Sequence, residues 1–141
     1  MATDHVTGLA TRGDFEAWLN ARVSFAGVTL LIVDVVGLKA VNEQRGFLAG
    51  DHALRLAADR LRDLSAGATL VARLGGDELV AVFPDADGAA RATRSLAEAN
   101  TAPTLRIGVT AGTDADTRET LVDRLYARLH AVPRQGQGVP E

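Results

Sequence analysis

Three acidic residues of the sequence have the types and positions needed to hold a metal ion. Asp34 ends the apolar, β-branched run 28–34, which predicts a strand buried on both faces. A carboxylate in such a place is costly unless it is paired or bound to a metal. Asp77 and Glu78 follow later in the chain. If the segments that carry the three acids are neighbours in one sheet, their carboxylates converge, and such oxygen ligands favour Mg²⁺ or Mn²⁺ over zinc.

The two later acids stand at the tip of a predicted β-hairpin. The apolar runs 69–74 and 79–83 flank them, and Gly75 and Gly76 precede them. Glycines allow a tight turn and the close approach of phosphates to the backbone. Because Mg²⁺ held by few carboxylates completes its shell with water and substrate phosphate, these residues indicate a site for a magnesium nucleotide. A solvated acidic turn plus a capping aspartate explains the same residue types, so both interpretations stay open here.

Composition narrows the class of protein. The chain has 141 residues, 47% of them hydrophobic, which predicts one domain over 1–141 with an ordered core over about 4–131 and a loose tail at 134–141. A net charge of −3 argues against a nucleic-acid interface, and the absence of cysteine excludes disulfides and thiolate metal sites. No signal peptide and no apolar run of membrane-spanning length is present, so we expect a cytoplasmic protein without membrane contact.

Hydrophobic periodicity predicts the element order α-β-α-α-β-β-α-β-α. The first helix begins at Thr11 or Asp14, carries Val23 on its apolar stripe, and is ended by Gly27. The other elements are expected as a strand over 28–34, helices over 38–44 and from about 49 to 64, the hairpin over 69–83, a helix over 89–99, a strand over 104–110 and a helix over 117–130.

Five separated stretches resemble, in order and spacing, the motifs of the GGDEF family of diguanylate cyclases. Arg-Leu-Gly-Gly-Asp-Glu-Leu at 73–79 resembles the signature itself. The stretch 4–12 resembles the opening D-x-L-T-G-L-x-N-R, and 34–42 resembles D-x-D-x-F-K-x-I-N. The stretch 46–51 resembles G-H-x-x-G-D, and Ile-Gly-Val at 107–109 resembles S-I-G-V. Several motifs in the right order are far more specific than one pentapeptide.

The resemblance implies an α+β fold like the palm of nucleotidyl cyclases and polymerases, with a central, mostly antiparallel sheet flanked by helices. It implies a diguanylate cyclase that condenses two GTP molecules into cyclic di-GMP with Mg²⁺ or Mn²⁺. Two domains meet face to face for this reaction, so a homodimer is expected, with a regulatory partner domain or protein that brings the two together.

The resemblance also assigns roles to individual residues. The metals would polarise the α-phosphoryl group and lower the pKa of the attacking hydroxyl. Two of the substrate-binding residues match positions that recognise guanine, one matches a phosphate-contacting lysine, and two form the turn along the phosphates. The residues implicated are Asp77 and Glu78 for catalysis; Asp34, Asp77 and the carbonyl of Val35 for the metal; and Lys39, Asn42, Asp51, Gly75 and Gly76 for the substrate.

Simpler roles are open for several of these residues. Asn42 could be a C-terminal cap of a short helix, Asp51 could cap the next helix at its N-terminus, and Lys39 could be an ordinary surface lysine. Asp4 and Arg12 are expected to form a structural ion pair that braces the entry segment, and Arg73 is also expected to be structural.

Four departures from the family pattern bear on activity. Val36 stands where the family has a second aspartate. Pro133 and Gln137 replace two basic residues that clamp the terminal phosphates in the family. The loss of these two contacts predicts GTP binding that is weaker by roughly a hundredfold or more. Residues 66–69 lack the R-x-x-D of the family's product-inhibition site, so no feedback binding is expected there. The alternative to a cyclase is therefore a degenerate domain that binds GTP, GDP or a protein partner and signals without catalysis.

Overall fold

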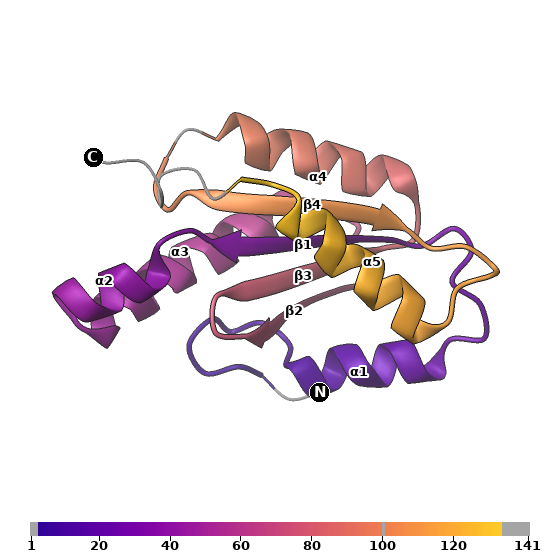
Figure 1. Ribbon diagram of the computed structural model, residues 1–141, viewed down its shortest axis with the longest axis horizontal. Helices are drawn as coiled ribbons and strands as arrows, with labels where there is room; N and C mark the ends of the chain where they lie inside the picture. Colours follow the sequence, from indigo (N-terminus) through magenta and orange to yellow (C-terminus); the bar gives the residue numbers. More distant parts are fainter. Residues whose placement is uncertain (1–2, 100, 134–141) are drawn as a thin grey trace.

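The computed structural model describes residues 3–99 and 101–133. It contains nine elements in the predicted order (Figure 1): α1 (Arg12–Ala21), β1 (Thr29–Val35), α2 (Leu38–Arg45), α3 (Phe47–Leu64), β2 (Leu70–Gly75), β3 (Glu78–Phe83), α4 (Ala86–Glu98), β4 (Leu105–Ala111) and α5 (Arg118–His130).

A four-stranded sheet with the order β2-β3-β1-β4 forms the centre of the domain. All its neighbouring strands are antiparallel, which confirms the predicted α+β architecture. The apolar, β-branched strand β1 lies between β3 and β4, and every one of its residues is buried. Its register sets Asp34 opposite both Glu78 and Arg106. The side chains of these three residues therefore leave the same face of the sheet.

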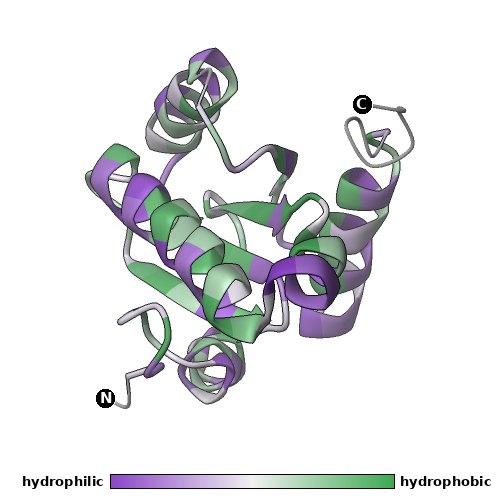
Figure 2. Ribbon diagram, turned by 90° about the vertical axis from the view of Figure 1, so that its left-hand side faces the viewer, coloured by the Kyte–Doolittle hydropathy of each residue, from purple (hydrophilic) through white to green (hydrophobic). Residues whose placement is uncertain are grey.

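Helices cover both faces of the sheet, so the core has two halves. Helices α3 and α4 pack with Leu31 and Val33 on one face, and α1 and α5 pack with Leu30 and Ile32 on the other. The strict alternation along β1 follows from the two-residue period of a strand. In Figure 2 the strands are mostly apolar, whereas the surrounding helices carry both apolar and hydrophilic residues. Two-sided coverage thus explains why β1 is continuously hydrophobic.

Three helix boundaries differ from the prediction. Helix α1 ends at Ala21, because Arg22 adopts an extended backbone, so Val23 is fully exposed and the expectation of Val23 in the apolar stripe is wrong. Helix α4 begins at Ala86 because the Asp85 side chain accepts a hydrogen bond from the amide of Gly88 at 2.8 Å. Helix α3 begins at Phe47, two residues before the predicted start.

The predicted ion pair between Asp4 and Arg12 is also wrong. Arg12 lies on the exposed side of α1 and pairs with Glu16 one turn later. Asp4 instead pairs with Arg73 at 3.2 Å, and Arg73 also donates a hydrogen bond to the Gly76 carbonyl at 2.9 Å. Arg73 therefore ties the hairpin turn to the N-terminal segment, which confirms the structural role expected for it.

Candidate functional site

A pocket of about 260 Å³ opens between α2, α3 and the tip of the β2–β3 hairpin. Five residues proposed from the sequence line it, and they come from three separate motifs. Its walls are completed by two leucines, a glycine and Arg73. The lining residues are Leu38, Lys39, Asn42, Gly50, Asp51, Leu54, Arg73, Gly76 and Asp77.

The side chain of Asn42 lies against Gly50, which joins α2 to α3 inside the pocket. A Cβ atom placed on Gly50 would overlap the amide oxygen of Asn42. Helix α2 is capped at its C-terminus by Gly46, and the same residue caps the N-terminus of α3. The simpler capping roles considered for Asn42 and Asp51 are therefore wrong, and both side chains are left to line the pocket.

The hairpin turn depends on its two glycines. Gly76 has a φ of 41° and Gly75 a φ of 156°, in the region that side chains rarely adopt. The pairing of β2 with β3 shifts register between Arg73 and Gly75, so the turn contains a bulge. This geometry presents Gly76 and Asp77 to the pocket, while Gly75 is not among the lining residues.

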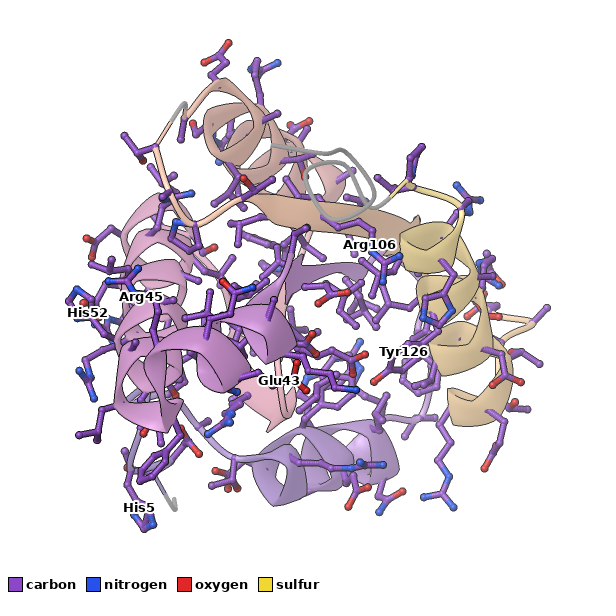
Figure 3. The ribbon with its side chains drawn as sticks, turned by 60° about the vertical axis from the view of Figure 1, so that its left-hand side comes forward. His5, Glu43, Arg45, His52, Arg106 and Tyr126 are labelled. Carbon is purple, nitrogen blue, oxygen red and sulfur yellow. The ribbon has the colours of Figure 1, made fainter. Side chains whose placement is uncertain are left out.

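Asp34 is buried, with 1% of its surface exposed, and it forms an ion pair with Arg106. One oxygen of the carboxylate, Oδ2, accepts a hydrogen bond from Nη2 of Arg106 at 2.6 Å. Arg106 is itself only 5% exposed. Figure 3 shows Arg106 from β4 and Tyr126 from α5 at the side of the sheet that α5 covers. The buried carboxylate thus has a cation supplied by the protein.

Asp77 lies close to Asp34 at the end of β1. The amide of Val35 donates a hydrogen bond to the Asp77 carbonyl at 3.0 Å, which fixes the hairpin turn against this strand. Burial, together with a hydrogen bond to Asp34 and the negative charge of Asp34, raises the pKa of Asp77 to about 6. The two aspartates therefore form an adjacent pair of acids between the pocket and the buried Arg106.

Glu78 takes a different direction from Asp77. Its side chain accepts a hydrogen bond from the Tyr126 hydroxyl at 2.8 Å. It therefore faces α5, and it does not line the pocket. Successive residues of a strand point to opposite faces, so Asp77 and Glu78 separate where the strand begins. Burial, followed by the bond to Glu78 and its charge, raises the pKa of Tyr126 to about 12.

We expect this tyrosine to titrate at an unusually high pH. The chain has one tyrosine, so ultraviolet absorbance of tyrosinate reports Tyr126 alone. The midpoint should lie near 12 in the native protein, against 10 for a free tyrosine. Glu78→Gln should lower this midpoint without restoring it to 10, because burial is the larger cause. A midpoint near 10 in the native protein would contradict both the burial of Tyr126 and its bond to Glu78.

The chain matches, over residues 1–137, the family described as diguanylate cyclase, GGDEF domain. It belongs to the GGDEF family. The response regulator PleD of Caulobacter vibrioides is 32% identical over 157 residues, which cover 96% of this chain and 34% of PleD. The diguanylate cyclase DgcP of Pseudomonas aeruginosa is 33% identical over 87 residues, 58% of this chain and 13% of DgcP. The GGDEF domain thus corresponds to a minor part of these longer relatives.

Solved structures agree with this assignment. A sensory box/GGDEF family protein from Caulobacter crescentus superposes with a TM-score of 0.75 at 26% identity, covering 96% of this chain and all of that one. The GGDEF domain of FimX from Pseudomonas aeruginosa has a TM-score of 0.79 at 22% identity, covering 97% and 96%. The predicted family and fold are therefore confirmed. Within residues 3–99 and 101–133, no helix has the length and hydropathy to cross a membrane.

The acids of this GGDEF domain do not fit a divalent cation bound through Asp34 as they stand. Within the described residues, no group of three acidic or histidine side chains is arranged to hold a metal ion. Asp34 is engaged by Arg106 and Glu78 by Tyr126. The three acids do come together, because Asp34 lies opposite Glu78 and the charges of both raise the pKa of Asp77. They are not arranged as a set of metal ligands, so the metal roles of Asp34, Val35 and Asp77 stay predictions.

Reasoning from the sequence missed Arg106 and Tyr126. The strand over 104–110 alternates, so its charged residue at 106 could have been placed on one face together with Gly108 and Thr110. A buried Asp34 calls for a cation, and Arg106 was a candidate because it lies inside a predicted strand. Gln137 lies outside the described residues, as does the tail at 134–141, so the loss of the phosphate clamp remains a prediction.

Proposed function

We propose that this GGDEF domain binds GTP in the pocket between α2, α3 and the hairpin tip. The observation that carries the proposal is the meeting of Lys39, Asn42, Asp51, Gly76 and Asp77 around one cavity. The Asp51 carboxylate accepts hydrogen bonds, and the Asn42 amide both donates and accepts them. Together they complement the donors and acceptor on the edge of a guanine base. Lys39 is exposed at the same pocket and supplies a positive charge for phosphate.

Two functions use this pocket. The resemblance predicts a diguanylate cyclase, in which two GTP-loaded domains face each other and each 3′-hydroxyl attacks the other α-phosphate. The second is nucleotide binding without efficient turnover, as a signalling domain. The Asp34–Arg106 ion pair favours the second function, because it occupies the acid that the cyclase reaction would use. Pro133, in place of a basic residue, supports the same conclusion.

Two measurements test the proposal. Calorimetry compares the binding of GTP, GDP and ATP, and chromatography detects the products formed after incubation with GTP. We expect GTP and GDP to bind more tightly than ATP, and Asn42→Ala or Asp51→Asn to weaken GTP binding by roughly tenfold or more. We expect little or no cyclic di-GMP. Abundant cyclic di-GMP that disappears in Asp77→Ala would establish the cyclase instead. Absence of any nucleotide binding would overturn the proposal.

Gly50→Ala is expected to weaken GTP binding without destabilising the domain. Alanine favours a helix interior by roughly 1 kcal/mol over glycine. The new methyl group, however, must displace the amide of Asn42, and losing its hydrogen bond to the base should cost roughly tenfold in affinity. Thermal unfolding and calorimetry measure the two effects separately.

A double-mutant cycle with Asn42→Ala provides the control. If Gly50→Ala acts through Asn42, the double variant should bind GTP as weakly as Asn42→Ala alone. Additive losses would mean that Gly50→Ala disturbs another part of the pocket.

A further inference from the structure

The buried ion pair between Asp34 and Arg106 joins the central strand β1 to the edge strand β4. Both residues lie in paired strands, at positions directly opposite each other. Side-chain exposure is 5% for Arg106 and 2% for Asp34, so solvent screens their attraction very little. A guanidinium stays protonated in proteins, so its positive charge is permanent. Asp34 therefore faces a fixed cation whatever the surrounding concentration of metal.

This arrangement competes directly with a divalent cation. Mg²⁺ requires a carboxylate oxygen at about 2.0–2.1 Å and near-octahedral geometry. Nη2 of Arg106 already stands 2.6 Å from Oδ2 of Asp34. A metal on Asp34 would be repelled by this guanidinium, or would require Arg106 to leave a buried position on β4. Separating a buried ion pair costs free energy, and this cost would weaken the binding of the metal.

The other charges facing this place do not offer an equivalent metal ligand set. Glu78 lies on β3 opposite Asp34, and its carboxylate accepts a hydrogen bond from the hydroxyl of Tyr126 on α5. Asp77 reaches the place from the hairpin turn and shares a hydrogen bond with Asp34. The guanidinium of Arg106 is thus the cation that Asp34 contacts, while Glu78 is bound to Tyr126 and Asp77 to Asp34.

We propose that Arg106 permanently takes the place of a metal ion at Asp34, so that this domain binds guanine nucleotides without a divalent cation on that carboxylate. The nucleotide half of this statement rests on the proposed GTP pocket. The metal half concerns Asp34 and Arg106 alone and can be tested without nucleotide. Serine is the matched substitution, because the resemblance at Ile-Gly-Val over 107–109 has serine in the preceding position.

The metal half of the proposal is tested by titrating the chain with Mn²⁺ in the absence of nucleotide. Electron paramagnetic resonance measures the concentration of free Mn²⁺. The wild-type chain and Asp34→Asn should bind Mn²⁺ equally, because Asp34 holds no metal in either. Arg106→Ser should gain affinity for Mn²⁺ by roughly ten- to hundredfold, because substituting a residue that contacts a metal ligand changes metal affinity by about this factor. Arg106→Ser combined with Asp34→Asn should lose that gain, and Arg106→Lys, which keeps the charge, should resemble the wild type.

Two results would overturn the proposal. One is Mn²⁺ binding by the wild-type chain that Asp34→Asn removes, which needs no variant at Arg106. The other is a folded Arg106→Ser chain with no gain in Mn²⁺ affinity. If Arg106→Ser fails to fold, the comparison of wild type with Asp34→Asn still decides the question.

Calorimetry of the wild-type chain with GTP, in EDTA and then in Mg²⁺, tests the nucleotide half. Affinities within about threefold of each other are expected, a difference below about 0.7 kcal/mol. A tenfold or greater gain from Mg²⁺ that Asp34→Asn removes would overturn the inference while leaving GTP binding intact. Failure of GTP to bind in both buffers would instead refute the proposed function, and the Mn²⁺ titration would still decide whether Arg106 replaces the metal.

Discussion

Arg106→Ser is expected to lower the free energy of unfolding by about 3–5 kcal/mol, the cost of leaving one partner of a buried ion pair uncompensated. The substitution leaves the carboxylate of Asp34, which is 1% exposed, without the guanidinium of Arg106. The carboxylate still lies beside Asp77, a second acid, whose pKa is raised. Equilibrium denaturation in urea measures the change, with far-ultraviolet circular dichroism as the signal.

Two controls separate the buried pair from an ordinary loss of charge. Arg12→Ser removes an exposed pair with Glu16 and should change stability by less than about 1 kcal/mol. Replacing both buried partners, with Asp34→Leu and Arg106→Met, should recover most of the loss, because apolar residues of similar volume often match a buried pair. A loss below about 1 kcal/mol in Arg106→Ser would show that Asp34 is solvated or paired by another group.

Gly108→Ala is expected to lower the free energy of unfolding by about 1–3 kcal/mol, as overpacking of a core contact does. A Cβ at this position of β4 would lie 2.7 Å from the amide nitrogen and 2.9 Å from the Cα of Leu129. These are backbone atoms of α5 and have no rotamer to change, so the helix itself must shift. Leu129 and Leu125 bury α5 against the sheet, so the shift disturbs one half of the core.

Gly13→Ala is the matched control for Gly108→Ala. Gly13 lies on the exposed side of α1, where a Cβ would approach no atom closer than 3.6 Å. This variant should be unchanged or more stable by up to about 1 kcal/mol, the helix preference of alanine over glycine. Thermal unfolding of both variants measures the difference, and equal stability of the two would show that α5 adjusts freely to β4.

The parts of this fold that follow from local pattern were predictable. The run 28–34 is apolar without alternation, and β1 is buried on both faces. The two glycines between apolar runs predicted the hairpin, and the resemblance to the GGDEF motifs assigned Lys39, Asn42 and Asp51 to one site, where all three line the same pocket. Helix ends were less predictable, since Arg22 ends α1 through a backbone conformation that its residue type does not dictate.

The partners of the acids were not predictable, because they depend on register. Asp34 meets Arg106 only because β1 and β4 pair with those two residues opposite each other. A shift of one residue would send Arg106 to the other face. Glu78 was expected beside Asp77, but a strand begins at Glu78 and turns its side chain towards Tyr126.

The contacts that hold the hairpin tip and the end of β1 also bear on the order in which the chain folds. Arg73 meets Asp4 across 69 positions of sequence, Glu78 meets Tyr126 across 48, and Asp34 meets Arg106 across 72. Contacts between distant residues form after local ones, because closing long loops costs entropy before the contact can repay it. We therefore expect the Val35 amide, which donates to the Asp77 carbonyl, to gain protection in pulsed hydrogen exchange later than the amides of α3. On this account the proposed nucleotide pocket is assembled last, and a newly made chain acquires its secondary structure before this pocket is complete.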